Sequence, residues 1–350
     1  MTVPRTLSMS RRAVLGTAAA LAETPSLAEV CTVGPPKQKK GPLVWTDMDQ
    51  VELDAAYDQN VYAPMIAQIQ TRYATSSVTT RARLGMPKRF AYGPTAVEGL
   101  DLYPAKTANA PIFIFVHGGR WLRGAAKDYG FPADLFVNAG VNYIAPDFIA
   151  VNAAKGDLRP MADQVRRAIA WVYHNAASFG GDAKRFYVGG HSSGGHLCGL
   201  ALVTNWQKDF GLPADFITAG LLMSGIYDMK APRLSARSSY VKFDDDMEQS
   251  MSSLRQLDKL RAPITVTYGT FESPEFQRQS HVRHGGEGRR QAGRIDRSAE
   301  LQPFLNVREP GQSLRPERTR GAQVDEARLI ASAIKKRPPH LGDLFQLREL

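Results

Sequence analysis

The segment RFYVGGHSSGGHLCGLALV, residues 185–203, decides the fold class. Its opening residues, 185–189, form a short apolar run typical of a buried strand, and residues 194–203 have the small and apolar side chains of a buried helix. Between them lies GHSSG, residues 190–194, a G-x-S-x-G pattern. Between a strand and a helix, this pattern predicts a sharp turn that exposes Ser192 above the end of a sheet. We interpret Ser192 as the candidate nucleophile.

Apolar runs that alternate with helical segments surround this turn. An amphipathic helix is expected over residues 161–178, and helical spacing also covers residues 53–73, ending before Ser76-Ser77. The other expected strands are residues 111–116, 141–145, 219–224 and 263–268. Strands that alternate with helices predict an α/β fold, with a mostly parallel sheet covered by helices on both faces.

A second glycine-rich turn, HGGRW at residues 117–121, directly follows the apolar run 111–116. Glycine lets the main chain approach a substrate oxygen closely. The N–H groups of Gly118, Gly119 and Ser193 are therefore the expected oxyanion donors, each worth roughly 3–4 kcal/mol in the transition state. His117 is a poor candidate for the general base, because such a turn uses its backbone. The other interpretation of His117 is a histidine packed in the core.

An acidic residue is needed to orient the base of a serine hydrolase. The chain order of this architecture is serine, acid, histidine, so the acid should follow a later strand. Glu272, just after the run 263–268, is the first choice. Asp228, at the end of the preceding strand, is the alternative, and its other interpretation is a carboxylate that caps a turn. Glu275 is better explained as a residue of the first turn of a helix, where the dipole favours a negative charge.

Together, the HGGRW turn, the GHSSGGH turn and the segment ESPEF resemble kynurenine formamidases (arylformamidases) over roughly residues 53–280. The segments at 57–64, 92–94, 99–104 and 235–240 strengthen the resemblance. It implies an α/β-hydrolase fold and a small-molecule acyl substrate, an N-formyl amide or a small ester, with no cofactor and no metal. It places the nucleophile at Ser192 and the acid at Glu272. Since HGG turns also occur in hormone-sensitive-lipase-like esterases, a short-acyl carboxylesterase is the alternative.

The chain departs from this family after Ser280. The family places its triad histidine after one further strand, whereas here the sequence becomes rich in Arg, Gly and Gln and loses its apolar periodicity. His281 and His284 follow Glu272 too closely for another strand to intervene, and no strand precedes His340. We therefore expect the last strand and helix to be missing and residues 281–350 to form an atypical, disordered basic tail. A catalytically impaired chain without the triad histidine is a further alternative.

A shift of reading frame near Ser280 would explain this departure. Residues 293–304, GRIDRSAELQPF, can be encoded so that reading one base later gives VELIVARSYNH. That product is a buried strand followed by a histidine, as the resemblance requires. Sequencing the gene tests the interpretation, which is wrong if no shifted frame contains such a segment.

The start of the chain predicts export. Ser10-Arg11-Arg12 precedes a short apolar run that ends near Ala22, as in a twin-arginine signal. The run is too short to span a bilayer, so no stable membrane anchoring is expected. The expected organisation is a signal-like segment and linker at residues 1–40, the hydrolase domain at 41–280 and the tail at 281–350. A periplasmic or secreted protein follows if the signal is used, and a cytoplasmic one if it is not.

The charge and the cysteines exclude other classes of function. The formal net charge is +10, and half of it comes from residues 281–350, with 14 Lys and Arg against 9 Asp and Glu. Because no basic patch is interleaved with aromatic residues, we do not expect nucleic-acid binding. The two cysteines, Cys31 and Cys198, are too few for a disulfide framework and lack zinc-site spacing. Cys198 lies in an apolar run, which predicts a packing role.

Overall fold

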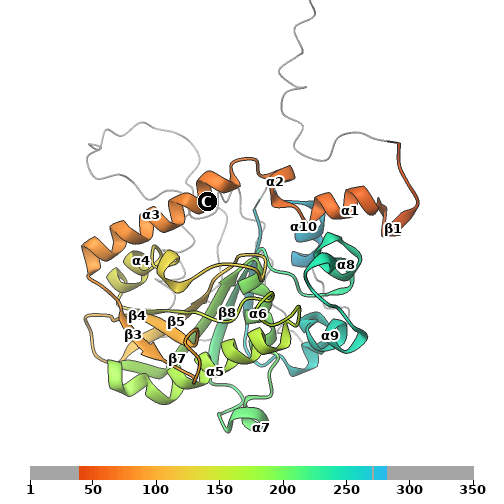
Figure 1. Ribbon diagram of the computed structural model, residues 1–350. Helices are drawn as coiled ribbons and strands as arrows, with labels where there is room; N and C mark the ends of the chain where they lie inside the picture. The colour runs from red at the N-terminus through yellow and green to blue at the C-terminus, as the bar shows by residue number, and fades with distance from the viewer. Residues whose placement is uncertain (1–38, 270–271, 282–350) are drawn as a thin grey trace, which may run out of the picture. The chain divides into compact units, whose positions relative to one another are not determined.

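The computed structural model describes residues 39–269 and 272–281 (Figure 1). The signal-like segment, most of the linker, the tail and any strand or helix beyond His281 lie outside these residues. The helices, 3-10 helices (η) and strands are, in chain order, β1 (Leu43–Trp45), β2 (Met48–Asp49), α1 (Gln50–Ala56), α2 (Gln59–Tyr62), α3 (Ile66–Leu84), β3 (Lys88–Ala91), β4 (Gly99–Tyr103), β5 (Ala110–Val116), η1 (Ala126–Asp128), α4 (Ala133–Asn138), β6 (Asn142–Pro146), α5 (Arg159–Asn175), η2 (Ala176–Phe179), β7 (Gly181–His191), α6 (Ser193–Leu202), α7 (Trp206–Phe210), β8 (Ile217–Met223), α8 (Lys230–Leu234), η3 (Ala236–Ser239), α9 (Asp245–Ser250), η4 (Ser253–Lys259), β9 (Ile264–Thr267) and α10 (Pro274–Ser280).

A seven-stranded sheet forms the centre of the fold, with the strand order β3-β4-β6-β5-β7-β8-β9. Strands β6, β5, β7, β8 and β9 are parallel, and β4 pairs antiparallel with both β3 and β6. The expected mostly parallel sheet is therefore confirmed. Its carboxyl edge gathers the residues that follow β5, β7, β8 and β9, which include HGGRW, Ser192 and Glu272.

Side chains of β5 alternate between two separate apolar clusters. Ile112, Ile114 and Val116 pack in the larger cluster with α5 and α6, whereas Phe113 and Phe115 pack in the smaller cluster with α4. This alternation is the two-residue period of a strand, and both faces are apolar because helices cover both (Figure 1). The continuous apolar run that predicted a buried strand is thereby explained.

The prediction of one helix over residues 53–73 is wrong. The segment divides into α1, α2 and α3, with Pro64 between α2 and α3. Proline lacks the N–H that a continuous helix would need at this position and disfavours a helical conformation in the residue before it. The expected stop at Ser76-Ser77 is also wrong, since α3 continues to Leu84. Ser77 is buried, and its hydroxyl donates to the Asp128 carbonyl, so tertiary packing places this serine inside a helix.

A buried carboxylate joins the N-terminal strand and helix to α10. Glu275 lies in the first turn of α10, as expected, but its side chain is fully buried. The Arg278 guanidinium contacts both carboxylate oxygens, at 2.6 and 3.0 Å. Trp45 Nε1 donates to Oε1 at 2.9 Å and the Tyr57 hydroxyl donates to Oε2 at 3.1 Å. Glu275 is therefore a structural clamp between segments more than 200 positions apart.

Replacing Glu275 by alanine should lower the free energy of unfolding by about 2 kcal/mol, because the partly exposed Arg278 would lose its buried charge partner and the donors of Trp45 and Tyr57 would lose their acceptor. Urea denaturation measures this loss. Asp245→Ala is the matched control: Asp245 is 95% exposed and also contacts an arginine, Arg233. Exposed pairs contribute little. Equal losses in the two variants would contradict the clamp.

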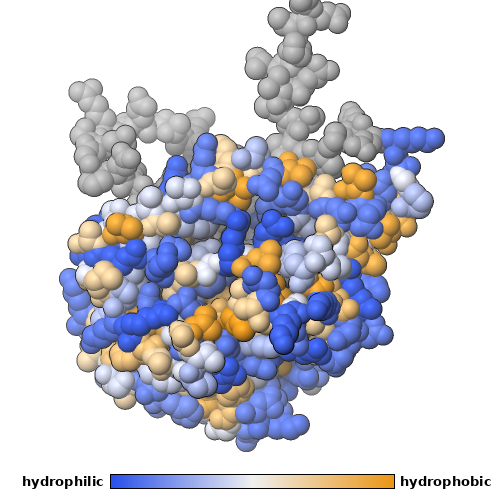
Figure 2. Space-filling model, viewed as in Figure 1, coloured by the Kyte–Doolittle hydropathy of each residue, from blue (hydrophilic) through white to orange (hydrophobic). Residues whose placement is uncertain are grey.

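Hydrophilic side chains cover most of the face seen in Figure 2, with small apolar patches between them. Leu43 and Met65 are among the exposed apolar residues, at 62% and 60% exposure. Among residues 39–269 and 272–281, no helix is both long and apolar enough to cross a membrane.

Candidate active site

Ser192 occupies the turn between β7 and α6 in a sparsely populated backbone conformation, with φ of 56° and ψ of −124°. A non-glycine residue in such a conformation is strained by roughly 1–3 kcal/mol. Two hydrogen bonds hold the strained residue: its N–H donates to the Met223 carbonyl at 2.8 Å, and its carbonyl accepts from His196 N–H at 3.1 Å. The backbone therefore has the sharp, strained strand-to-helix turn that the sequence predicts at Ser192.

Gly118 brings the HGGRW turn against this serine. A Cβ atom at Gly118 would lie 2.9 Å from the His191 carbonyl oxygen and 3.2 Å from Ser192 Cβ, so only glycine allows this approach. The structure thus places Gly118 directly beside Ser192.

His117 fixes the direction of the next peptide. Its ring is 2% exposed and stacks on Tyr129 and Phe148, with ring centroids 5.2 and 4.3 Å away. Its Nδ1–H donates to the Gly118 carbonyl at 2.9 Å. In a trans peptide the carbonyl of Gly118 and the N–H of Gly119 point in opposite directions. The Gly119 N–H therefore points away from the imidazole and remains available as a donor. Burial lowers the pKa of His117, which keeps the ring neutral.

Ser193 is the first residue of α6. The N–H groups of the first turn have no partner within a helix. The N–H of Ser193 is thus oriented with the helix dipole, beside the Ser192 side chain, where a developing negative charge would be stabilised.

The carboxylate of Glu272 lies beyond the end of β9 and contacts the end of β8. Ser224 Oγ donates to Glu272 Oε1, and the Glu272 N–H donates to the Gly269 carbonyl at 3.0 Å. Glu272 Oε2 is enclosed and has no hydrogen-bond partner among the described residues. Burial raises the pKa of Glu272 to about 7, against the lowering effect of the Ser224 hydroxyl.

Asp228, the alternative acid, is engaged in other contacts. Its Oδ1 accepts from the Lys230 N–H at 2.8 Å and from Arg255 at 3.0 Å. Gln279 binds the backbone N–H and carbonyl of the same residue. These contacts fit a carboxylate that caps a turn, which was the structural interpretation of Asp228.

The described histidines all have other surroundings. His281 Nδ1–H donates to the Gln277 carbonyl and its Nε2 accepts from the Tyr268 hydroxyl, at 2.7 and 3.0 Å. Burial lowers the pKa of His191 to about 4. His174 lies on the helix α5. Within the described ranges, no histidine ring hydrogen-bonds to the Ser192 hydroxyl or to the Glu272 carboxylate. His284 and His340 lie outside those ranges.

Two supporting contacts, which involve Trp121, His196 and Arg237, were missed by the sequence reasoning. Trp121, at φ of 63°, donates from Nε1 to His196 Nδ1 at 3.1 Å, and His196 Nε2–H donates to the Met251 carbonyl at 2.9 Å. This links the HGGRW turn to α6. The guanidinium of the buried Arg237 lies 5.1 Å from the Trp121 ring centroid and 5.3 Å from that of Tyr57. The sequence held one signal for the contact between Trp121 and His196. His196, the second histidine of GHSSGGH, lies at helical spacing from Ser192.

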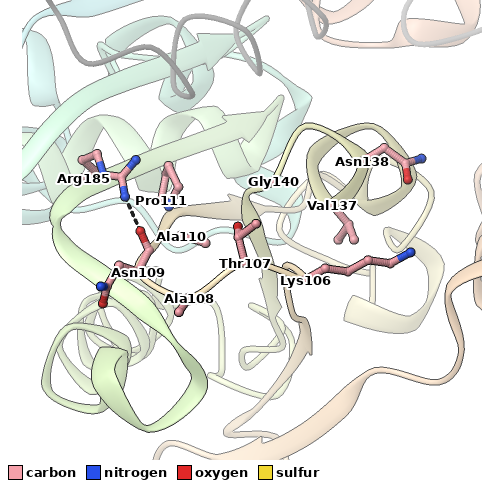
Figure 3. Close-up of a pocket in the computed structure, with 10 residues that line it drawn as sticks. All are labelled: Lys106, Thr107, Ala108, Asn109, Ala110, Pro111, Val137, Asn138, Gly140 and Arg185. Carbon is pink, nitrogen blue, oxygen red and sulfur yellow. Dashed lines mark hydrogen bonds between the residues drawn. The ribbon is translucent and has the colours of Figure 1, made fainter.

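One further cavity, of about 410 Å³, lies at the amino ends of β5 and β6 (Figure 3). Its lining includes Lys106, Ala110, Gly140 and Arg185, and Arg185 donates to the Asn109 carbonyl. Ser192 follows the carboxyl end of β7, which is parallel to β5, so this cavity lies at the opposite end of the strands and is separate from the candidate site.

In the described part of the chain, no group of three His, Cys, Asp or Glu side chains is placed to hold a metal ion. Cys198 is fully buried and belongs to the larger core cluster, which confirms its packing role.

The parallel sheet, the covering helices and the strained turn at Ser192 define an α/β-hydrolase. The BD-FAE family model matches residues 100–270. Kynurenine formamidase from Danio rerio is 30% identical over 253 residues, which cover 67% of this chain and 82% of the relative. The chain therefore belongs to the kynurenine formamidase-like family of α/β-hydrolases and is a hydrolase of the esterase and formamidase type.

Other relatives are esterases. Esterase LipC from Mycobacterium tuberculosis is 31% identical over 204 residues, covering 54% of this chain and 49% of the relative. Among solved structures, a Silicibacter protein proposed to be a thioesterase has a TM-score of 0.58 at 23% identity, covering 65% of this chain and 84% of that one. Esterase LipW from Mycobacterium marinum has a TM-score of 0.51 at 17% identity, with coverage of 64% and 75%. At these identities the two structures support the fold alone.

Proposed function

We propose that this chain is a serine hydrolase that cleaves a small N-formyl amide or ester through Ser192. The strained backbone of Ser192, with Gly118 directly beside it, is the observation that carries the proposal. Ser192 Oγ would attack the acyl carbon, and the N–H groups of Gly118, Gly119 and Ser193 would stabilise the negative oxygen that forms. The leaving amine or alcohol would depart with a proton, and water would then release the acyl group.

The general base would be a histidine whose Nδ1–H contacts Glu272 Oε2, the oxygen of this carboxyl group that has no partner among the described residues. Glu272 would orient this ring and stabilise its positive form. The described histidines make other contacts, which favours the second candidate function, a chain with impaired catalysis. Without a base, Ser192 would be a weak nucleophile at neutral pH.

The membership of the family favours a formyl substrate, and the esterase relatives favour a short acyl ester as the alternative. The export signal, localisation and the absence of a nucleic-acid partner remain expectations from the sequence.

Turnover should be higher for an N-formyl aryl amide than for the matching acetyl ester. A site that fits a formyl hydrogen has no room for the methyl group of an acetyl substrate, and one such group gives roughly 10-fold or greater discrimination in kcat/KM. Steady-state hydrolysis of the two compounds at equal concentration measures the ratio. A preference for acetyl would support the carboxylesterase alternative. No turnover of either, with or without added imidazole as a substitute base, would support the impaired chain.

A further inference from the structure

Ser224 follows the last residue of β8 in an unusual conformation. Its φ is 51°, in the left-handed region that a residue with a side chain rarely adopts, and it is 8% exposed. Its N–H donates to the Thr267 carbonyl at 2.7 Å, which ties the end of β8 to the end of β9. Strain of this kind persists where surrounding structure fixes it and often marks a functional site.

The hydroxyl of Ser224 donates to one oxygen of Glu272, Oε1. The other oxygen, Oε2, is enclosed without a partner in the described ranges. The further groups near this carboxyl are the backbone of Gly269, which lowers its pKa, and the phenols of Tyr73 on α3 and Tyr227 after β8. Neither phenol donates to Oε2, so the two oxygens have unequal surroundings.

We propose that Ser224 is a positioning residue for the catalytic acid: its hydroxyl holds Oε1 so that Oε2 alone is presented to the base. The inference rests on the proposed function. Glutamate has one more rotatable bond than aspartate, so a fixed direction of its carboxylate costs more side-chain entropy. A hydrogen bond from a rigid strand end offsets this cost. Ser224 would act through Glu272 and would not contact the substrate.

The hydroxyl should also favour the ionised carboxylate. Burial raises the pKa of Glu272 from its ordinary 4.5 to about 7, and Ser224 opposes that rise. The folded protein therefore holds a proton here that the unfolded chain has lost, so stability from this group is complete below about pH 4.5 and is lost as the pH rises through 7. Without Ser224 the pKa of Glu272 should rise further, and the loss of stability at high pH should grow.

Urea denaturation of Ser224→Ala and Ser224→Gly at pH 5.5 and pH 8.5 tests the contact without any need for activity. Both variants remove the hydroxyl, whereas only glycine relieves the strained φ. We expect each variant to raise the equilibrium constant for unfolding above that of the parent protein. The factor of this increase should be about tenfold larger at pH 8.5 than at pH 5.5. The extra effect should vanish in a Glu272→Gln background. Ser280→Ala, which removes a buried hydroxyl bonded to the Phe276 carbonyl, should show no such pH dependence.

The rate of fluorophosphonate labelling between pH 5 and 9 tests the positioning role. In Ser224→Ala the low-pH limb of the pH–rate profile for labelling should move to higher pH. The labelling rate at pH 7 should be about tenfold lower than in the parent protein. An unmoved limb, or a pH-dependent stability effect that persists in the Glu272→Gln background, would overturn the proposal. If the parent protein does not label at all, the proposed function fails, and the denaturation result alone decides whether Ser224 holds Glu272.

Discussion

Replacing Ser192 by alanine should reduce fluorophosphonate labelling and substrate turnover to background. The probe bonds to the serine oxygen that attacks, and alanine has no such atom. Removal of the nucleophile typically costs at least about 10³-fold in turnover, even where a binding site and oxyanion donors remain. Intact-mass spectrometry measures labelling, and peptide mapping should place the adduct of the parent protein on Ser192.

Two companion variants separate chemistry from folding. Ser178→Ala removes an exposed hydroxyl bonded to the Asn175 carbonyl, and its labelling should equal that of the parent. Ser192→Gly should abolish labelling while raising the free energy of unfolding by about 1 kcal/mol, because glycine relieves the strain at φ of 56°. Labelling that survives in Ser192→Ala would mean that another residue is the nucleophile.

Replacing Gly194 by alanine should prevent normal folding or lower the free energy of unfolding by about 3 kcal/mol or more. A Cβ atom there would lie 2.0 Å from the Val116 carbonyl oxygen and 2.5 Å from that of His117. Both atoms belong to the backbone, which cannot move aside as a flexible side chain would. Overpacking of this kind typically costs about 1–3 kcal/mol even against side chains. Thermal unfolding and the soluble yield measure the effect.

The matched control for this variant is Gly211→Ala. Gly211 adopts φ of 66°, but no atom lies within 4 Å of a Cβ built there. Its cost should therefore be only the conformational term, about 1 kcal/mol. The Gly194 variant should also lose labelling, since β5 would be pushed away from α6. Similar stability for the two variants would contradict the close approach of the Ser192 turn to the end of β5.

Local patterns in the sequence determined much of this fold. The apolar runs at 111–116 and 185–189 predicted buried strands, and GHSSG predicted the strained turn, because strand burial and turn geometry depend on neighbouring residues. The antiparallel strands β3 and β4 were not predicted as strands. Both have short, mixed sequences, and β4 pairs on its other side with β6, a strand some 40 positions away.

The tertiary structure decided how distant residues meet. It placed Ser77 inside α3, because the contact of this serine with η1 outweighs its local turn preference. It also joined Ser224 to Glu272 and Trp121 to His196, contacts between residues 48 and 75 positions apart. The sequence by itself identified the candidate residues for the chemistry. Only the order and register of the strands decided which of their atoms touch, since long-range packing leaves no periodic signal.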